Sequence, residues 1–223
     1  LCCLNSVLAG IAMAALSAAA DAQQVLTFLS AGTSQSIPAT LFKPEGAGPF
    51  PAVVMMHDCS GLGPRSSGAP SRWSKELLSQ GYVILIPDSF SPRGIVDGVC
   101  TMQDVSLRNP VGGPVRAADA YGALAALRAL PYVDQQRVGI MGNSHGGWTT
   151  LAAMVAPVSD GEPLAEAKRS GFAAAIALYP RCTVRLGDWS TTQRGRSGPM
   201  SGHSGVYRAI APTLILAGEK DDW

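Results

Sequence analysis

Residues 142–147 read Gly142-Asn143-Ser144-His145-Gly146-Gly147 and stand between two segments of different character. The residues before them, 137–141, are mostly apolar and predict a short strand, while residues 148–156 are small and apolar and predict a helix. A Gly-x-Ser-x-Gly sequence between a strand and a helix is typical of a serine nucleophile presented on a sharp turn. Glycine at positions 142 and 146 omits the Cβ atoms that would clash where strand and helix meet. A glycine-rich turn with an idle serine is the alternative interpretation.

The composition indicates one ordinary globular domain. The chain has 223 residues, of which 47% are hydrophobic, enough for a single sizeable core. Its 17 Lys and Arg residues nearly balance its 16 Asp and Glu residues, and no basic run stands out. This charge pattern argues against nucleic acid and against a membrane surface as partners.

The first 22 residues have the features of a signal peptide. Residues 7–20 are small and apolar, and Ala20-Asp21-Ala22 has the A-x-A form of a cleavage site. The chain has no initiating Met and no basic residue before this run, so we expect a few residues to be missing at its start. We predict a signal peptide over 1–22, a folded domain over 23–223, and export to the periplasm or the outside without a stable membrane partner. An uncleaved anchor is the alternative.

Apolar runs and turn-forming residues alternate along the remaining chain. An opening hairpin is predicted at 25–29 and 37–42, buried strands at 52–56 and 82–86, further strands at 173–179 and 213–217, and helices at 72–80 and 114–130. Leu124, Leu127 and Leu130 mark the inner side of the second helix. Strands separated by helices predict an α/β fold with a mostly parallel sheet. The Gly/Ser/Arg-rich segment 183–208 is predicted to be an irregular surface insertion.

Two further segments follow strands, where ligands bind in sheets of this kind. His57-Asp58-Cys59-Ser60-Gly61 follows the strand at 52–56, and a glycine-containing loop there can turn a backbone N–H toward an oxyanion. Gly218-Glu219-Lys220-Asp221 follows the last strand, where an acid belongs if the order is Ser, acid, His. The backbone N–H of His145, at the start of a helix, is the other candidate oxyanion donor.

On these residues the chain resembles the dienelactone hydrolase family of α/β-hydrolases over residues 50–223. The matching pieces are His57-Asp58 with its glycine loop, Gly81-Tyr82 to Pro87-Asp88, 138–142 with the turn, and Gly218 to Asp221. The resemblance implies an α/β-hydrolase fold with helices on both faces of a mostly parallel sheet. It also implies Ser144 as nucleophile, Asp221 as the acid that orients the base, and the N–H groups of Cys59 and His145 as the oxyanion hole.

Two departures bear on the substrate. The best-known members of the family carry Cys as nucleophile, so Ser144 points toward general ester hydrolysis. An Arg soon after the Pro-Asp pair binds a substrate carboxylate in such enzymes, and Arg93 stands near that place but displaced. Arg93 is therefore a candidate for binding an anionic substrate. Tyr179 and Trp148 are candidates for lining an acyl pocket, with core packing as the alternative for each.

The catalytic histidine is expected outside the sequence. The family places it after the acid, following another strand and a helix, whereas this chain ends at Trp223. We therefore expect a C-terminal truncation, a fold that lacks the last strand and helix, and the histidine beyond residue 223. His57 and His145 are expected to be structural, and nothing in the sequence places His203 at the site.

Three other acids and the cysteines leave alternatives open. Asp222 is an alternative to Asp221; Asp88 is either an acid or a turn cap; Asp58 either tunes the nucleophile or caps its loop. After removal of the signal segment, Cys59, Cys100 and Cys182 remain, and Cys100 with Cys182 is a plausible pair in an oxidising compartment. The pairing stays open at this point. No spacing of Cys and His predicts a metal site.

The sequence thus predicts an exported serine hydrolase that cleaves small-molecule carboxylic esters by acyl transfer and needs no cofactor. A serine peptidase of the acylaminoacyl-peptidase or prolyl-oligopeptidase type is the first alternative, because Gly-x-Ser-His-Gly-Gly also resembles the turn of those enzymes. A non-catalytic binding protein on a hydrolase scaffold is the second.

Overall fold

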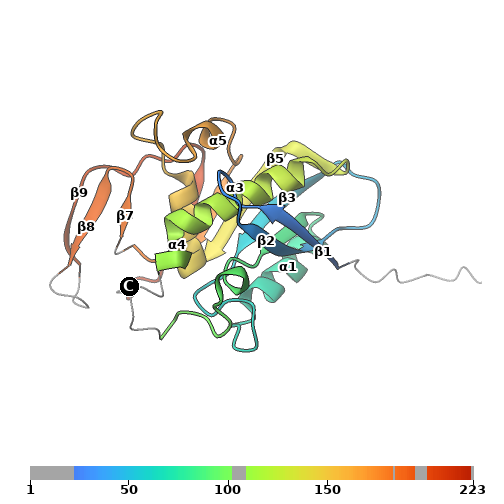
Figure 1. The fold of residues 1–223 in the computed structure, drawn as a ribbon, viewed down its shortest axis with the longest axis horizontal. Helices are drawn as coiled ribbons and strands as arrows, with labels where there is room; N and C mark the ends of the chain where they lie inside the picture. The colour runs from blue at the N-terminus through green and yellow to red at the C-terminus, as the bar shows by residue number, and fades with distance from the viewer. Residues whose placement is uncertain (1–22, 102–108, 183, 194–199, 222–223) are drawn as a thin grey trace, which may run out of the picture.

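A seven-stranded sheet forms the centre of the computed structural model, in which residues 23–101, 109–182, 184–193 and 200–221 are described (Figure 1). The strand order is β1-β2-β4-β3-β5-β6-β10. The predicted hairpin is confirmed as β1 (Gln24–Leu29) and β2 (Ser36–Phe42), which pair antiparallel. The expected signal segment, 1–22, lies outside the described residues.

The other five strands run parallel to one another, as predicted. They are β3 (Phe50–Met56), β4 (Val83–Pro87), β5 (Val133–Asn143), β6 (Ala175–Leu178) and β10 (Thr213–Leu216). All five residues of β4 are buried, which explains its unbroken apolar sequence. β5 begins before the predicted strand at 137–141 and ends directly before Ser144.

Helices cover both faces of this sheet. The helices α3 (Gly113–Arg128) and α4 (His145–Met154) pack on one face, in a core that includes Val54, Ile140 and Leu127. On the other face, α1 (Ala69–Ser79) packs over alternate strand residues such as Val53 and Ile84. The fold is therefore an α/β-hydrolase type of sheet with helices on both sides. Leu124 and Leu127 are buried as predicted, and Leu130 is partly buried against the same core.

The prediction of an irregular insertion at 183–208 was wrong. This segment forms a small antiparallel sheet of β7 (Arg185–Leu186), β8 (Trp189–Gln193) and β9 (Met200–Ser204). Its strands are short and rich in Ser, Thr and Gly, so no apolar alternation marks them in the sequence. The short helix α5 (Ala165–Arg169), between α4 and β6, was also not predicted.

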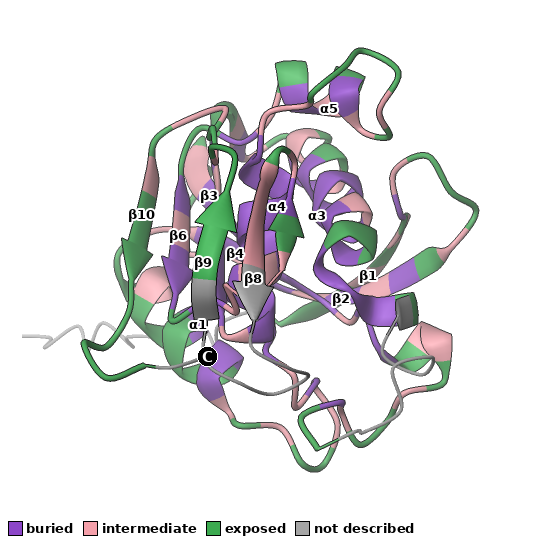
Figure 2. Ribbon diagram, turned by 90° about the vertical axis from the view of Figure 1, so that its left-hand side faces the viewer, coloured by how far each residue is buried: buried purple, intermediate pink, exposed green. Residues whose placement is uncertain are grey.

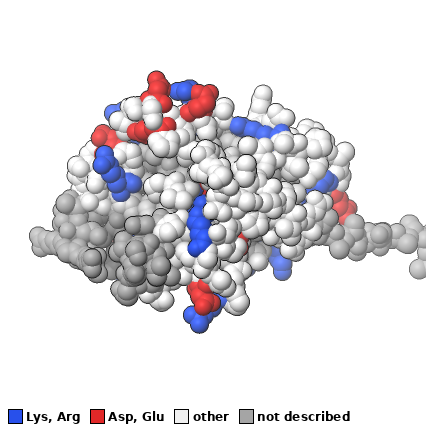
Figure 3. All heavy atoms as spheres, viewed as in Figure 1, with Lys and Arg blue, Asp and Glu red and all other residues white. Residues whose placement is uncertain are grey.

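The surface includes an exposed sheet border and a group of charged side chains near α5. β10 forms one border of the sheet, and its side chains are largely exposed (Figure 2). On the face seen in Figure 3, charged side chains are sparse and gather mainly over α5, where Arg169 pairs with Asp160 and Glu166. None of the described helices combines the length and apolar character needed to cross a bilayer.

Candidate active site

Ser144 stands in a strained turn between β5 and α4. Its φ of 52° and ψ of −114° are unusual for a residue with a side chain. The Ser144 N–H donates to the carbonyl of Leu178 at 2.9 Å, and the Ser144 carbonyl accepts the N–H of Arg181 at 3.3 Å. The end of β6 and the loop after it therefore hold the turn that the sequence predicted.

The two glycines of the motif are required by close backbone approach. A Cβ on Gly142 would lie 2.3 Å from the carbonyl oxygen of Gly146. A Cβ on Gly146 would lie 2.1 Å from the carbonyl oxygen of Met56, at the end of β3. Both distances are far below ordinary van der Waals contact, so any larger residue would separate β3, β5 and α4. This confirms the steric role that the sequence assigned to these glycines.

The loop after β3 is tied to the residue before the nucleophile by Asp58. The Asp58 carboxylate accepts hydrogen bonds from the hydroxyl groups of Ser60 and Ser67, and from the Asn143 side-chain amide at 3.1 Å. Burial favours the neutral acid, but hydrogen bonds from Ser60, Ser67 and Asn143 outweigh it and hold the pKa of Asp58 below its usual value. Asp58 is thus an ionised cap of its loop that also reaches the nucleophile turn.

The expected oxyanion donors come from neighbouring strands. β3 and β5 pair in parallel, with Met56 opposite Gly142, so the loop carrying Cys59 and the turn carrying His145 begin side by side. The short distance from Gly146 to the end of β3 brings the two segments together at the same edge. This arrangement fits the predicted pair of backbone donors, whose role remains a prediction.

Cys59 pairs with Cys100, so the predicted Cys100–Cys182 pair was wrong. Cys59 follows β3 and Cys100 lies in the loop after β4, and these two strands are neighbours. Cys182 follows β6, which β5 separates from β3 and β4. Cys182 keeps a free thiol, and burial together with the charge of Asp221 raises its pKa.

A fully buried arginine, Arg116 of α3, lies behind the nucleophile turn and was missed in the sequence. Its guanidinium donates to the His57 carbonyl at 2.8 Å and contacts Nδ1 of His145 at 2.7 Å. Since arginine has only donors, we assign Nδ1 of His145 as an unprotonated acceptor. Burial lowers the pKa of Arg116 to about 9. Its spacing from Ala120 and Leu127, on the inner side of the helix, is the signal that could have revealed it.

Neither His57 nor His145 occupies a position suited to a base. His57 is completely buried, its Nδ1 lies 2.9 Å from the Asp58 carbonyl, and burial and the charge of Arg116 lower its pKa well below 6.5. His145 is also buried and engaged by Arg116. These two findings agree with the structural roles predicted from the sequence. His203 lies exposed in β9 of the small sheet.

The candidate acids fall into different places. Asp221 follows β10, and its N–H donates to the Gly218 carbonyl at 3.1 Å. β10 pairs in parallel with β6, and Leu178 at the end of β6 accepts the N–H of Ser144. Asp221 therefore lies at the same edge of the sheet as the loop after β6. Asp88 accepts the N–H groups of Phe90 and Ser91 at 3.0 Å each, which makes it a turn cap. Asp222 lies outside the described residues.

The three candidate substrate contacts have different surroundings. Tyr179 has φ of 34°, and its hydroxyl lies 3.1 Å from the Asn143 amide nitrogen. Trp148 is partly buried, with the Arg181 guanidinium 5.7 Å from its ring centre. Both therefore lie beside the nucleophile turn. Arg93 instead forms two hydrogen bonds to the buried carboxylate of Asp119, at 2.8 and 2.9 Å, so its guanidinium serves an ion pair within the fold.

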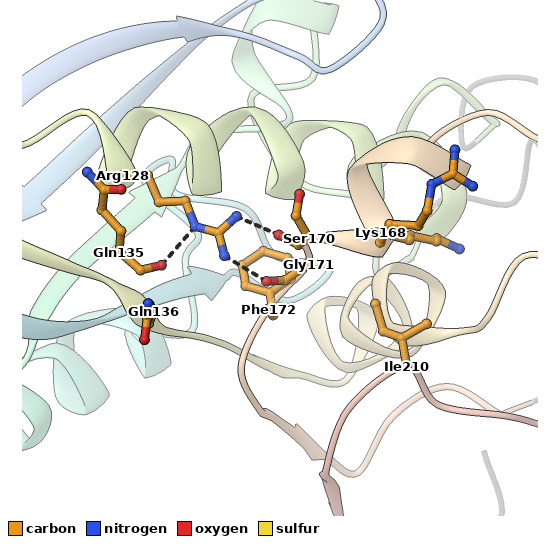
Figure 4. Close-up of a pocket in the computed structure, with 9 residues that line it drawn as sticks. Arg128, Gln135, Gln136, Lys168, Ser170, Gly171, Phe172 and Ile210 are labelled. Atoms are coloured by element: carbon orange, nitrogen blue, oxygen red, sulfur yellow. Dashed lines mark hydrogen bonds between the residues drawn. The ribbon is translucent and has the colours of Figure 1, made fainter.

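Two hollows in the surface lie away from Ser144. One of about 480 Å³ lies near the amino ends of β5 and β6, opposite the edge that carries the nucleophile (Figure 4). There Arg128 donates to the carbonyls of Gln135, Ser170 and Gly171, so its guanidinium is committed to the fold. A second hollow, about 330 Å³ and mostly apolar, lies on the sheet face beside α1. Among the described residues, no cluster of His, Cys, Asp and Glu is arranged to hold a metal ion.

The family assignment follows from a direct match. The model of the dienelactone hydrolase family matches residues 37–223, which include the loop after β3, the nucleophile turn and Asp221. This chain belongs to the dienelactone hydrolase family. Membership in this family supports a hydrolase function.

Solved structures show the same fold at low identity. A Klebsiella pneumoniae protein assigned as a dienelactone hydrolase has 18% identity and a TM-score of 0.52, covering 87% of this chain and 72% of its own. The esterase Est22 has 19% identity and a TM-score of 0.52, covering 71% of this chain and 44% of its own. Dipeptidyl peptidase 4 of Porphyromonas gingivalis has 24% identity and a TM-score of 0.50, covering 72% and 21%.

The chain therefore spans less than half of the esterase and about a fifth of the peptidase. No curated protein matches it. The chain has serine at position 144, the predicted nucleophile, and Arg93, the predicted carboxylate ligand, is bound by Asp119.

Proposed function

We propose that this protein is a serine hydrolase that cleaves carboxylic esters of small molecules through an acyl-enzyme on Ser144. The observation that carries the proposal is the strained backbone of Ser144, with φ of 52° between β5 and α4. Such strain persists only where the surrounding structure enforces it, and it is concentrated at functional sites. Serine in place of the cysteine of the best-known relatives favours general ester hydrolysis.

In the proposed reaction, the Ser144 hydroxyl attacks the ester carbonyl while a histidine takes its proton. The N–H groups of Cys59 and His145 stabilise the oxyanion, the leaving alcohol takes the proton from the histidine, and an acyl-enzyme remains. Water then attacks the acyl-enzyme with the same histidine as base, which releases the acid and restores Ser144. Asp221 orients the histidine, and the chemistry uses no cofactor.

We assign the base to a histidine that follows the acid in the chain order Ser, acid, His. The support for this assignment is the geometry of the other candidates, since His57 and His145 are buried and already bonded. The order Ser, acid, His is also the one expected for α/β-hydrolases. The experiments therefore use protein expressed from the complete coding sequence.

The test combines a substrate with a covalent probe. Hydrolysis of p-nitrophenyl butyrate and labelling by a fluorophosphonate are measured for the wild type, Ser144→Ala and the exposed control Ser170→Ala. We expect Ser144→Ala to lose at least about 10⁴-fold in kcat and all labelling, because the nucleophile is removed. Ser170→Ala should match the wild type. Hydrolysis that survives in Ser144→Ala would overturn the proposal, and a wild type without labelling would favour a binding protein.

A serine peptidase is the second candidate. The fold it shares with the Porphyromonas gingivalis dipeptidyl peptidase 4 and the Gly-x-Ser-His-Gly-Gly turn are the observations that favour it. Cleavage of aminoacyl p-nitroanilides faster than p-nitrophenyl esters would identify a peptidase. We expect the reverse order.

We also propose that the protein is exported to the periplasm or secreted. The Cys59–Cys100 disulfide supports export, since disulfides persist mainly in oxidising compartments. Cell fractionation with an antibody against the folded domain tests this proposal, and recovery of the mature protein only in the cytosol would contradict it.

A further inference from the structure

Cys59 is fixed by a second loop, which contains residues 98–100. Its carbonyl accepts the N–H of Val99 at 2.6 Å, and its sulfur is bonded to Cys100. Gly98, at φ of +78°, approaches so closely that a Cβ there would lie 2.5 Å from the Cys59 oxygen and 2.8 Å from Ser60. The loop after β3 and residues 98–100 therefore contact each other through their backbones.

The side-chain contact between the two loops on their exposed side is weak. Arg65 and Asp97 are the ion pair across the two loops, at 3.8 Å, and their side chains are 75% and 63% exposed. An exposed pair at this distance contributes little. Val99, by contrast, is buried with Phe90 in a small core that Cys59 contacts. Cys59 is thus held by the hydrogen bond from Val99 and by the disulfide to Cys100.

We propose that the Cys59–Cys100 disulfide positions the oxyanion hole, so that ester hydrolysis depends on the oxidised form of this pair. The inference rests on the proposed function, in which the Cys59 N–H is an oxyanion donor. A donor must lie within hydrogen-bond distance of the developing charge, so a small displacement of residue 59 lowers transition-state stabilisation. The disulfide acts on the reaction through this N–H and does not touch the substrate.

Reduction of the pair is chemically simple. Cys100 is exposed, so a small dithiol reaches the bond. Dithiothreitol supplies two electrons and two protons, the sulfur–sulfur bond breaks into two thiols, and dithiothreitol closes to its cyclic disulfide. A protein that has not yet been oxidised is therefore a poor hydrolase, which confines its activity to an oxidising compartment.

The first experiment reduces and reoxidises one protein. We use the Cys182→Ser variant without residues 1–22, which removes Cys2 and Cys3 as well, so that none of these thiols exchanges with the pair, and measure p-nitrophenyl butyrate hydrolysis and the fluorophosphonate labelling rate. Reduction should lower kcat by about 10- to 100-fold with little change in KM, and oxidised glutathione should restore it. Near-UV circular dichroism checks that the reduced protein stays folded. An unchanged kcat, with both thiols confirmed by titration, overturns the inference.

The second experiment displaces the same residue with the disulfide intact. Gly98→Ala places a Cβ against the Cys59 carbonyl, whereas Gly94→Ala, at φ of +74°, meets nothing within 4 Å. Both substitutions carry the same backbone strain, so their difference reports the contact with Cys59. We expect kcat to fall at least about tenfold in Gly98→Ala and to stay near the wild-type value in Gly94→Ala.

The outcomes separate the two proposals. If the oxidised wild type neither hydrolyses esters nor reacts with the fluorophosphonate, the proposed function and this inference both fall. If the oxidised protein is active but Gly98→Ala and Gly94→Ala have equal kcat, the inference alone falls. If the reduced protein unfolds, the two glycine variants decide whether the position of Cys59 controls hydrolysis, and equal kcat values overturn the inference.

Discussion

Ser144 and Asp221 follow strands of the same parallel sheet, but their surroundings differ. Around Ser144, the bonds of Asp58, Asn143 and Arg116 join buried groups of α3, α4, β5 and the loop after β3. Asp221 follows β10, whose residues Leu214, Ile215 and Leu216 are 51%, 47% and 50% exposed (Figure 2). The surroundings of Ser144 are thus fixed by buried hydrogen bonds, whereas Asp221 follows a strand whose side chains are half exposed.

The largest effect is expected from the ion pair that links α3 to the loop after β4. Asp119 is completely buried, and Asp119→Asn leaves Arg93 without its countercharge. The free energy of unfolding should fall by about 3–5 kcal/mol, because an uncompensated charge remains in a nearly dry site. Urea denaturation measures this change.

Glu166→Gln is the matched control for Asp119→Asn. It removes the partner of Arg169 in a pair whose side chains are 53% and 86% exposed. Exposed pairs contribute at most about 1 kcal/mol, so the loss should be small. Similar losses in both variants would contradict the structural role assigned to the Arg93–Asp119 pair.

The next effect concerns the bond between the nucleophile turn and the loop after β3. Asn143→Ala removes the donor to Asp58 and the contact with the Tyr179 hydroxyl. We expect the free energy of unfolding to fall by about 1–3 kcal/mol, because buried polar groups are left unpaired. Because the loop also loses its tie to the turn, kcat should fall as well. Tyr179→Phe, which removes one of the two contacts, should have the smaller effect on both quantities.

The burial of His57 leads us to predict that the free energy of unfolding depends on pH. The pKa of His57 is lowered by burial and by Arg116, so the folded state resists protonation below pH 6.5 while the unfolded state accepts the proton. The contribution of His57 to the free energy of unfolding is therefore fully present above pH 6.5. On acidification below that pH, the free energy of unfolding falls by about 1.4 kcal/mol per pH unit. Asp58, whose pKa is also lowered, adds a loss only near and below pH 3.8.

Urea denaturation at a series of pH values tests this slope. His57→Gln should flatten it between pH 6.5 and the acid range, whereas His203→Asn, which removes an exposed imidazole, should leave it unchanged. An equal slope in wild type and His57→Gln would show that another group dominates.

The smallest effect is expected at the exposed border of the sheet. Ile215→Thr in β10 should change the free energy of unfolding by less than about 0.5 kcal/mol, because the side chain is half exposed. The same substitution at Ile84 of β4, which is completely buried, should cost at least about 2 kcal/mol. Equal losses would mean that β10 is covered in solution.

The sequence predicted the strands that are buried on both faces and the glycines of the nucleophile turn, because both leave local signals. Unbroken apolar runs mark β3 and β4, and Gly142 and Gly146 are fixed by contacts that only glycine permits. The small sheet around β8 leaves no such signal, since its strands are short and polar.

The parts of the site that were missed depend on which strands become neighbours. The Cys59–Cys100 pair forms because β3 and β4 are neighbours in the sheet. The order of strands in a sheet cannot be read from the sequence. Arg116 was missed because an arginine in a helix is usually solvent-exposed, whereas here it bonds to two segments distant in sequence.

The contacts of Ser144 with β6 also constrain when the site is completed during synthesis. The Ser144 N–H has its acceptor in Leu178, and the Ser144 carbonyl receives the N–H of Arg181, both of which leave the ribosome later. Before Leu178 and Arg181 are synthesised, these two hydrogen bonds cannot hold the turn in its strained conformation. The interval between synthesis of Ser144 and of these residues is on the order of seconds at ordinary rates of translation. In a nascent chain, these hydrogen bonds therefore fix the backbone of Ser144 only after β6 has joined the sheet.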